Sequence, residues 1–225
     1  MLLENKMNKE TIIKNTIEFV KKELENAEGG HDWFHIERVY KNTILISNDE
    51  KVDAFVVALG ALLHDIADPK FYNGDETIGP KIAKQFLEEQ KVDDEVILHI
   101  INIIKHISFK NSLEKGGKKF TSKELEVVQD ADRLDAIGAV GIARCFNYGG
   151  FKNRALYNPE IKPNLNMSKE EYKNSTAPTI NHFYEKLLLL KDKMNTATGK
   201  RIATERHLYM ENFLDQFYNE WNGEK

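Results

Sequence analysis

Residues 52–68, VDAFVVALGALLHDIAD, are apolar on most sides of a helix and carry a histidine and an aspartate side by side near their end. A helix that is hydrophobic all round is typical of the centre of a protein, and Pro69 should stop this one. Burying His64 and Asp65 is costly unless they meet a partner. The segment therefore predicts a central helix whose end contacts a polar or charged group.

The other long segments also repeat their apolar residues at the period of a helix. Residues 10–30 show this repeat before Gly29-Gly30, which should stop the helix. No segment alternates with the period of a strand, so the predicted fold class is all-α. Further helices are expected at 35–47, 75–90, 93–108, 124–146, 180–194 and 199–221.

Local signals indicate where some of these helices begin or bend. Thr121 and Glu124 have the spacing of a capping box for the helix at 124–146. That helix should bend or break around Gly138 and Gly141. Two stretches are expected to be irregular, 109–120 and 147–168, and the second is long enough to serve as a lid or a binding loop.

Composition narrows the class of protein. The 225-residue chain has 30% charged and 41% hydrophobic residues, which is typical of a globular protein. Its net charge of −4 argues against a nucleic acid polymer or an anionic membrane as partner. No apolar run approaches the roughly 20 residues of a membrane span, and no signal-peptide pattern is evident. Cys145 is the single cysteine, so no intramolecular disulfide can form, and we expect a cytoplasmic protein.

Histidines and acidic residues lie on the apolar helices or at their ends. Neighbouring residues of a helix project about 100° apart, close to the angle between adjacent positions of an octahedron. His64 and Asp65 could therefore bind one ion, and a mixed nitrogen and oxygen set suits Mn²⁺, Fe²⁺, Co²⁺, Ni²⁺ or Zn²⁺. Separate core positions and surface ion pairs would produce the same pattern. The other candidates are His35, His99, His106, Asp130, Asp132 and Asp135.

The order His35, His64-Asp65, Asp132 resembles the H…HD…D signature of the HD superfamily of metal-dependent phosphohydrolases, which are all-helical. The segments HDWFHIERV, ALLHDIAD and QDADRLDAIGAVGIAR, and the tail from Lys186 to Phe217, are similar to one bacterial subgroup of small HD hydrolases. The resemblance covers about residues 10–220. It implies a single HD-type domain over 1–225, a helical bundle with its core at about 28–140 and additional C-terminal helices at about 168–222.

The resemblance also implies the ligands: His35, His64, Asp65 and Asp132 would bind one divalent metal ion. We expect Mn²⁺, with Mg²⁺, Co²⁺, Fe²⁺, Ni²⁺ and Zn²⁺ as alternatives. In this interpretation Asp130 pairs with Arg133, and Asp135 supports the ligands from behind. Neither Asp130 nor Asp135 is counted among the four ligands.

A second histidine-aspartate pair, His31-Asp32, competes with His64-Asp65. Asp32 is a natural N-cap for the helix that carries His35. His31 and His35 are four positions apart and could converge on a metal if the helix already included His31. Gly29-Gly30 argues against such an early start. We therefore take His64-Asp65 as the metal-binding pair.

Catalytic and substrate-binding residues can be proposed around the metal. Asp68 could orient or deprotonate a water, or it could bond nearby backbone amides before Pro69. Arg38 lies one turn after His35 and could pair with Asp65 or a phosphate, or it could be an ordinary solvated arginine. Cations further along could bind a polyphosphate, although most such lysines line the solvent side of a helix: Lys186, Lys193, Lys200 and Arg206.

The resemblance implies a phosphohydrolase with a small-molecule nucleotide substrate, and within the subgroup the cleavage of deoxynucleoside triphosphates into monophosphate and pyrophosphate. Two alternatives stay open. One is a 5′-nucleotidase or phosphodiesterase on the same metal site. The other is a non-catalytic regulatory domain that binds metal or nucleotide. A homodimer is also left open.

Overall fold

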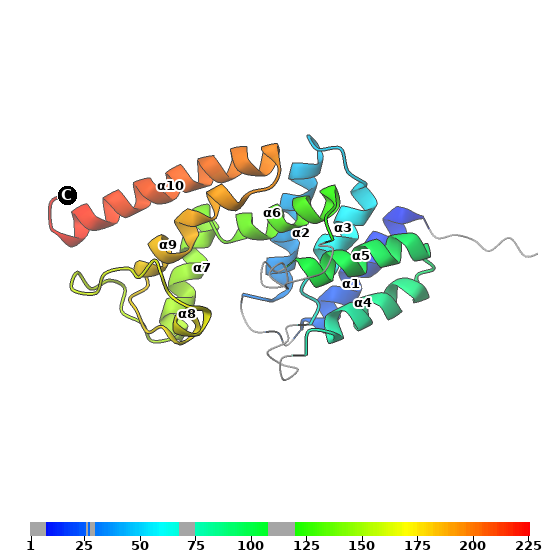
Figure 1. Cartoon of the computed structure of the whole chain (residues 1–225), viewed down its shortest axis with the longest axis horizontal. Coiled ribbons are helices and arrows are strands. Elements are labelled where there is room, and N and C mark those ends of the chain that lie inside the picture. The colour runs from blue at the N-terminus through cyan, green and yellow to red at the C-terminus, as the bar shows by residue number, and fades with distance from the viewer. Residues whose placement is uncertain (1–7, 26, 28–29, 68–74, 108–119) are drawn as a thin grey trace, which may run out of the picture. The chain divides into compact units, whose positions relative to one another are not determined.

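The computed structural model describes residues 8–25, 27, 30–67, 75–107 and 120–225 (Figure 1). All regular structure in these ranges is helical, which confirms the predicted all-α fold class. The chain divides into two compact units, residues 1–132 and 133–225. None of the described helices combines the length and the apolar character that crossing a membrane would require. The prediction of one HD-type domain over the whole chain stays a prediction.

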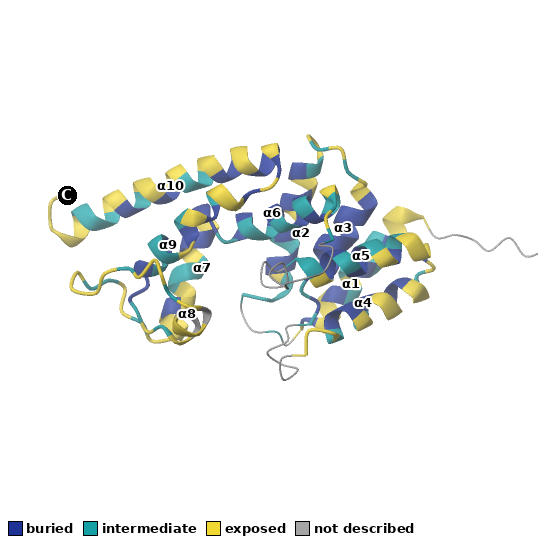
Figure 2. Ribbon diagram, in the orientation of Figure 1, coloured by how far each residue is buried: buried dark blue, intermediate teal, exposed yellow. Residues whose placement is uncertain are grey.

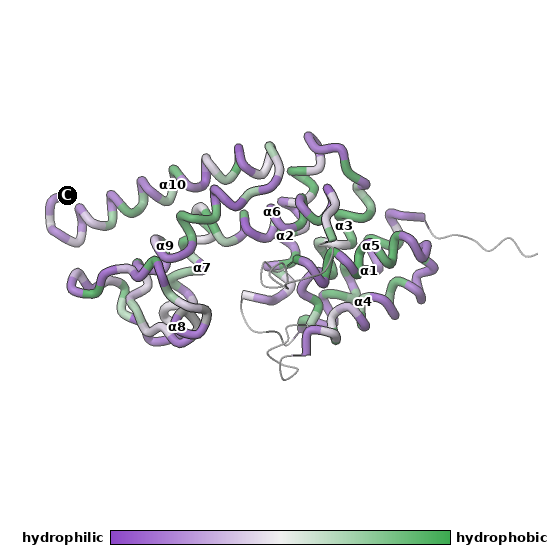
Figure 3. The backbone as a smooth tube through the Cα atoms, in the orientation of Figure 1, coloured by the Kyte–Doolittle hydropathy of each residue, from purple (hydrophilic) through white to green (hydrophobic). Residues whose placement is uncertain are grey.

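The first unit is built around one buried helix. Helix α3 (Ala54–Leu63) is buried at every position from Phe55 to Leu63 and is hydrophobic along nearly its whole length (Figures 2 and 3). Each fully buried leucine of such a helix contributes roughly 1.5–3 kcal/mol. Its neighbours are α1 (Lys9–Glu23), α2 (Trp33–Ser47) and α5 (Asp94–His106). Helix α4 (Ile78–Glu89) packs against α5.

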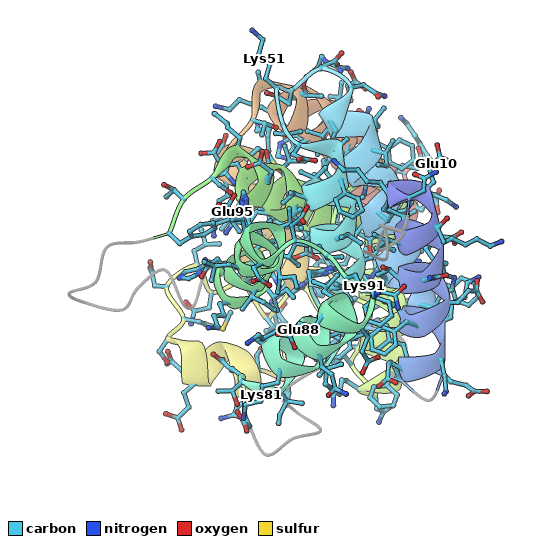
Figure 4. The ribbon with its side chains drawn as sticks, turned by 90° about the vertical axis from the view of Figure 1, so that its right-hand side faces the viewer. Glu10, Lys51, Lys81, Glu88, Lys91 and Glu95 are labelled. Atoms are coloured by element: carbon cyan, nitrogen blue, oxygen red, sulfur yellow. The ribbon has the colours of Figure 1, made fainter. Side chains whose placement is uncertain are left out.

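Charged residues cover the outside of this unit. Glu10 on α1, Lys81 and Glu88 on α4 and Glu95 on α5 are exposed (Figure 4). Apolar residues of the same helices face inward, for example Ile100 of α5, which is fully buried. This division is the amphipathic pattern expected of helices that surround a core.

Helix α3 approaches its neighbours closely at one glycine. A Cβ atom at Gly60 would lie 3.3 Å from a side-chain carbon of Ile103 on α5 and 3.5 Å from one of Val128 on α6 (Lys123–Asp135). Helix α6 is also joined to α2, because the side-chain amide of Asn42 donates to the carbonyl of Ala131 at 3.3 Å. These contacts connect α3 with α5 and α6, and α6 with α2. Three of the four predicted ligands lie on α2, at the end of α3 and on α6.

The helix ends mostly follow the sequence signals. The Asp32 carboxylate accepts from the His35 amide and caps α2, as predicted. The predicted capping box of α6 is displaced by one residue, since the amide of Leu125 donates to Ser122 Oγ at 3.0 Å. Glu124 accepts instead from the backbone amide of Asp53. Helix α1 ends at Glu23, before the double glycine that was expected to stop it.

The second unit contains α7 (Gly138–Phe151), α8 (Lys169–Asn174), α9 (Asn181–Glu185) and α10 (Ala197–Trp221). The predicted break between α6 and α7 is confirmed at Gly138, whose φ of 76° is in the left-handed region that favours glycine. Helix α7 continues to Phe151, so the first residues of the stretch expected to be irregular are helical. The buried core of this unit includes Phe183, Met210 and Leu214.

The single helix predicted over 180–194 is wrong. Helix α9 ends at Glu185, and Lys186 has a φ of −144° that no helix allows. Two 3₁₀ turns follow, η3 (Leu187–Leu189) and η4 (Lys191–Lys193). Residues three apart share one side of a 3₁₀ helix, so this geometry buries Leu187 and Leu190 together. Four successive leucines concealed this difference, because they fit either kind of helix.

Candidate metal centre

Three of the four predicted ligands lie together. His35 is in the first turn of α2, His64 is the residue that ends α3, and Asp132 is on α6. Their ligand atoms all lie within 4.8 Å of one another. Oδ1 of Asp132 is 3.6 Å from Nε2 of His35 and 3.9 Å from Nε2 of His64. Within the described part of the chain, this is the one group of three or more such residues that could hold a metal.

The two imidazoles are buried and held in place. His35 is 3% and His64 is 8% exposed, and their rings meet edge to face at 5.5 Å between centroids. Nδ1 of His64 donates to the carbonyl of Ala61 at 2.8 Å. This bond fixes the tautomer and leaves Nε2 with a lone pair toward Asp132. The Asp132 side chain is 41% exposed, so the group is open on its carboxylate side.

The spacing of these atoms fits a divalent ion. Two ligand atoms about 2.1–2.2 Å from one ion lie about 3.0 Å apart at a right angle and about 3.5 Å apart at a tetrahedral angle. The observed separations of 3.6 and 3.9 Å exceed the tetrahedral value by about 0.1–0.4 Å and the right-angle value by about 0.6–0.9 Å. Small side-chain rotations would close that difference. Two imidazole nitrogens and a carboxylate also form a donor set that divalent transition metals prefer.

Asp65, the fourth predicted ligand, makes a different contact. Its Oδ2 accepts from Nδ1 of His31 at 2.5 Å. Burial works to raise the pKa of Asp65, but the bond from His31 and the nearby charges of His64, His31 and His35 lower it below its usual value. The carboxylate is thus close to the same imidazoles, although it is not a member of the group of three. Its role as a ligand stays a prediction.

His31 is the residue of this site whose contact the sequence interpretation missed. Its ring lies 6.0 Å from that of His35 and contacts Asp65 from the segment before α2. The spacing of four between His31 and His35 was the available signal. Gly29-Gly30 correctly indicated that the helix starts later, but it did not exclude a contact from outside the helix.

The two predicted catalytic residues are Asp68 and Arg38. Asp68 lies outside the described residues. Arg38 is half-buried on α2, one turn after His35. Both assignments stay predictions.

The four predicted substrate-binding cations all belong to the second unit. Lys186, Lys193 and Lys200 are exposed. Arg206 is partly buried and donates to the carbonyl of Leu134 at 2.5 Å. Burial lowers the pKa of Arg206, and the charge of Asp135 acts in the opposite direction. Arg206 therefore has a structural contact, and the role of all four in binding substrate stays a prediction.

The remaining candidates have other contacts. Asp135 is 2% exposed and forms an ion pair with Arg144 at 2.5 Å. The guanidinium of Arg133 donates to the carbonyl of Lys193. Two further histidines bond near α5 and α6: Nε2 of His99 lies 2.9 Å from Ser122 Oγ, and Nδ1 of His106 lies 2.8 Å from the carbonyl of Asn102. Asp130 is fully buried.

Comparison with known proteins agrees with the geometry. The HD domain family matches residues 33–137, a range that includes His35, His64, Asp65 and Asp132. The uncharacterised protein YpgQ of Bacillus subtilis is 39% identical over 195 residues, which are 86% of this chain and 85% of that one. This chain therefore belongs to the HD superfamily of hydrolases.

Solved structures extend the likeness to nearly the whole chain. An HD-superfamily hydrolase from Bacillus thuringiensis has a TM-score of 0.77 and 45% identity, covering 96% of this chain and 99% of that one. The crystal structure of YpgQ in complex with ADP has a TM-score of 0.74 and 33% identity in the structural superposition, covering 95% and 97%. A Listeria innocua protein has a TM-score of 0.74 and 36% identity, covering 96% and 98%.

Proposed function

We propose that this chain is a metal-dependent phosphohydrolase that acts on nucleotides and cleaves deoxynucleoside triphosphates into monophosphate and pyrophosphate. The observation that carries the proposal is the convergence of His35, His64 and Asp132 on one point. The family supports phosphoester or phosphoanhydride hydrolysis. We also propose that the protein works in the cytoplasm, in keeping with its one half-buried cysteine, Cys145.

The ligand set would be His35, His64, Asp65 and Asp132, with Mn²⁺ as the expected ion. When bound, a divalent ion lowers the pKa of a coordinated water and polarises a phosphoryl oxygen. His64 presents Nε2 because its Nδ1 is already bonded to the carbonyl of Ala61. Asp132 is the most exposed of the group of three, so solvent and substrate can reach the site from its side.

Other residues would act on substrate. We assign Asp68 to orienting the attacking water and Arg38 to neutralising charge on a phosphate oxygen. Lys186, Lys193, Lys200 and Arg206 would supply further positive charge for a polyphosphate.

The proposal of a nucleotide substrate is based on a relative of this chain. YpgQ of Bacillus subtilis, similar over nearly the whole of both chains, has been crystallised with ADP. A nucleoside diphosphate offers a base, a sugar and a diphosphate, and its binding to YpgQ favours a nucleotide for this chain. The choice of a deoxynucleoside triphosphate comes from the family resemblance alone.

A panel of nucleotides with Mn²⁺ tests the proposal when phosphate and pyrophosphate are measured separately. Pyrophosphate release from deoxynucleoside triphosphates is the expected result. Phosphate release from monophosphates would indicate a 5′-nucleotidase, and cleavage of cyclic nucleotides a phosphodiesterase. Nucleotide binding without turnover would favour a regulatory domain.

Variants connect the activity to the metal site. Asp65→Ala should lower the metal content and abolish hydrolysis, while the helical circular dichroism signal is retained. Asp94→Ala removes an exposed carboxylate of the same unit and is the matched control. Full turnover in Asp65→Ala would refute the ligand assignment.

A further inference from the structure

We propose that His31 is a positioning residue of the metal centre, which holds the Asp65 carboxylate in place for the ion. The inference rests on the proposed metal site. Nδ1 of His31 donates to Oδ2 of Asp65 at 2.5 Å. That contact leaves Oδ1 of the same carboxylate available as a ligand atom. His31 would thus act through Asp65 and not on the ion.

Asp65 is the ligand that most needs such support. His64 ends α3 and is fixed by its bond to Ala61, and Asp132 is part of α6. Asp65 lies in a turn after the end of α3, where no helical backbone restrains it. Its side chain is still largely covered, at 21% exposure. A carboxylate in this position gains its orientation from side-chain contacts, and His31 provides the hydrogen bond.

The location of His31 suits this role. It stands directly before Asp32, whose carboxylate caps α2, so the start of that helix fixes the backbone beside it. Its ring is 6.0 Å from the ring of His35, with the two rings steeply inclined. The His31–Asp65 bond therefore joins the segment before α2 to the segment after α3, and each of these segments borders one buried ligand.

His31 is not placed as a ligand itself. Its ring nitrogens are not part of the group formed by His35, His64 and Asp132, and Nδ1 is occupied by Asp65. Removing a residue that orients a metal ligand in this way typically lowers the metal affinity by 10–100-fold.

Titration calorimetry with Mn²⁺ on the full chain tests the inference. His31→Ala should weaken binding by roughly 10–100-fold. His31→Asn should recover most of the affinity, because its amide nitrogen can stand near the position of Nδ1. His31→Gln places its amide one carbon further out and should behave like alanine. His207→Ala, which removes a histidine of α10 paired with Glu211, is the control and should bind as the parent protein does.

A double-mutant cycle shows whether His31 acts through Asp65. In an Asp65→Ala background, adding His31→Ala should change the Mn²⁺ affinity by less than about twofold. If the losses of Mn²⁺ affinity from Asp65→Ala and His31→Ala multiply in the double variant, the inference is overturned. It is also overturned if His31→Asn does not recover the affinity. Thermal unfolding of each metal-free variant shows that it is folded, and His31→Gln replaces His31→Ala if the latter is not.

The outcomes also separate this inference from the proposed site. If the parent protein does not bind Mn²⁺, or if His64→Ala binds it normally, the metal site itself is wrong. If His64→Ala loses binding and His31→Ala keeps the parent affinity, the site stands and the role of His31 is refuted.

Discussion

Nε2 of His35 lies 3.6 Å from Oδ1 of Asp132, so α2 and α6 each bring one proposed ligand atom to the same place. Asp132→Asn keeps the shape of the side chain but removes its charge. We expect Mn²⁺ affinity to fall at least tenfold, and the stability of the metal-free protein to change by less than about 0.5 kcal/mol, because the side chain is 41% exposed. Titration calorimetry measures the Mn²⁺ affinity, and urea unfolding measures the stability of the metal-free protein. Unchanged affinity would remove Asp132 from the ligand set.

Asp135 should show the opposite pattern. It is buried and paired with Arg144, and this ion pair explains its burial without any metal. Asp135→Asn should destabilise the protein by roughly 1–3 kcal/mol, since it leaves the guanidinium without its charged partner. Mn²⁺ affinity should stay within twofold of the parent value. A large loss of affinity together with normal stability would instead support the role behind the metal ligands that the sequence interpretation gave to Asp135.

Gly138 should tolerate no side chain. Its φ of 76° would cost alanine about 1–2 kcal/mol, and the new Cβ would lie only 3.0–3.2 Å from carbons of the Arg206 side chain. Gly138→Ala is therefore expected to lower the free energy of unfolding by at least that amount. Gly150→Ala is the control, because no atom lies within 4 Å of its Cβ position and it sits inside α7. That substitution should be neutral or stabilising by up to about 1 kcal/mol.

Acid should destabilise the protein through His182. Burial lowers the pKa of His182 to about 4, and the charges of Lys186 and Arg154 act in the same direction. Between pH 6.5 and pH 4 the unfolded chain binds a proton at this residue that the folded chain does not, so stability falls as the pH falls. The loss at pH 5 is on the order of 2 kcal/mol.

Urea unfolding at pH 8 and pH 5 measures this loss, and His182→Gln should reduce it by about the same amount. In the folded parent protein, the imidazole resonances of His182 should not titrate above pH 5 in NMR spectra. Equal acid sensitivity of the parent and the variant would contradict the prediction.

The sequence was most informative where one helix carries a continuous signal. The apolar residues of α3 predicted its burial, and Asp32 predicted the start of α2. His35, His64 and Asp132 were chosen through the family resemblance, and the structure brings those three together. Periodicity alone left a metal site and a set of unrelated core positions equally open, because it describes one helix at a time.

Contacts between separate segments could not be derived in the same way. The bond from His31 to Asp65 joins two segments outside the helices, where no period applies. Asp135 pairs with Arg144 across the break at Gly138, and a helical wheel drawn through that break misplaces it. The change from α9 to 3₁₀ turns at Lys186 likewise depends on which leucines the surrounding core can accept.

The close approach at Gly60 has a consequence for which ions the centre accepts. A helix seated against Ile103 and Val128 cannot slide to follow a change in ionic radius, and the bond from His64 to Ala61 removes the rotation of that ring as well. With the proposed ligands, any adjustment between a larger cation and a smaller one would therefore fall on the carboxylates of Asp132 and Asp65, of which Asp132 is the more exposed. Imidazole positions should coincide in crystals grown with Mn²⁺ and with Zn²⁺, while the aspartate oxygens shift.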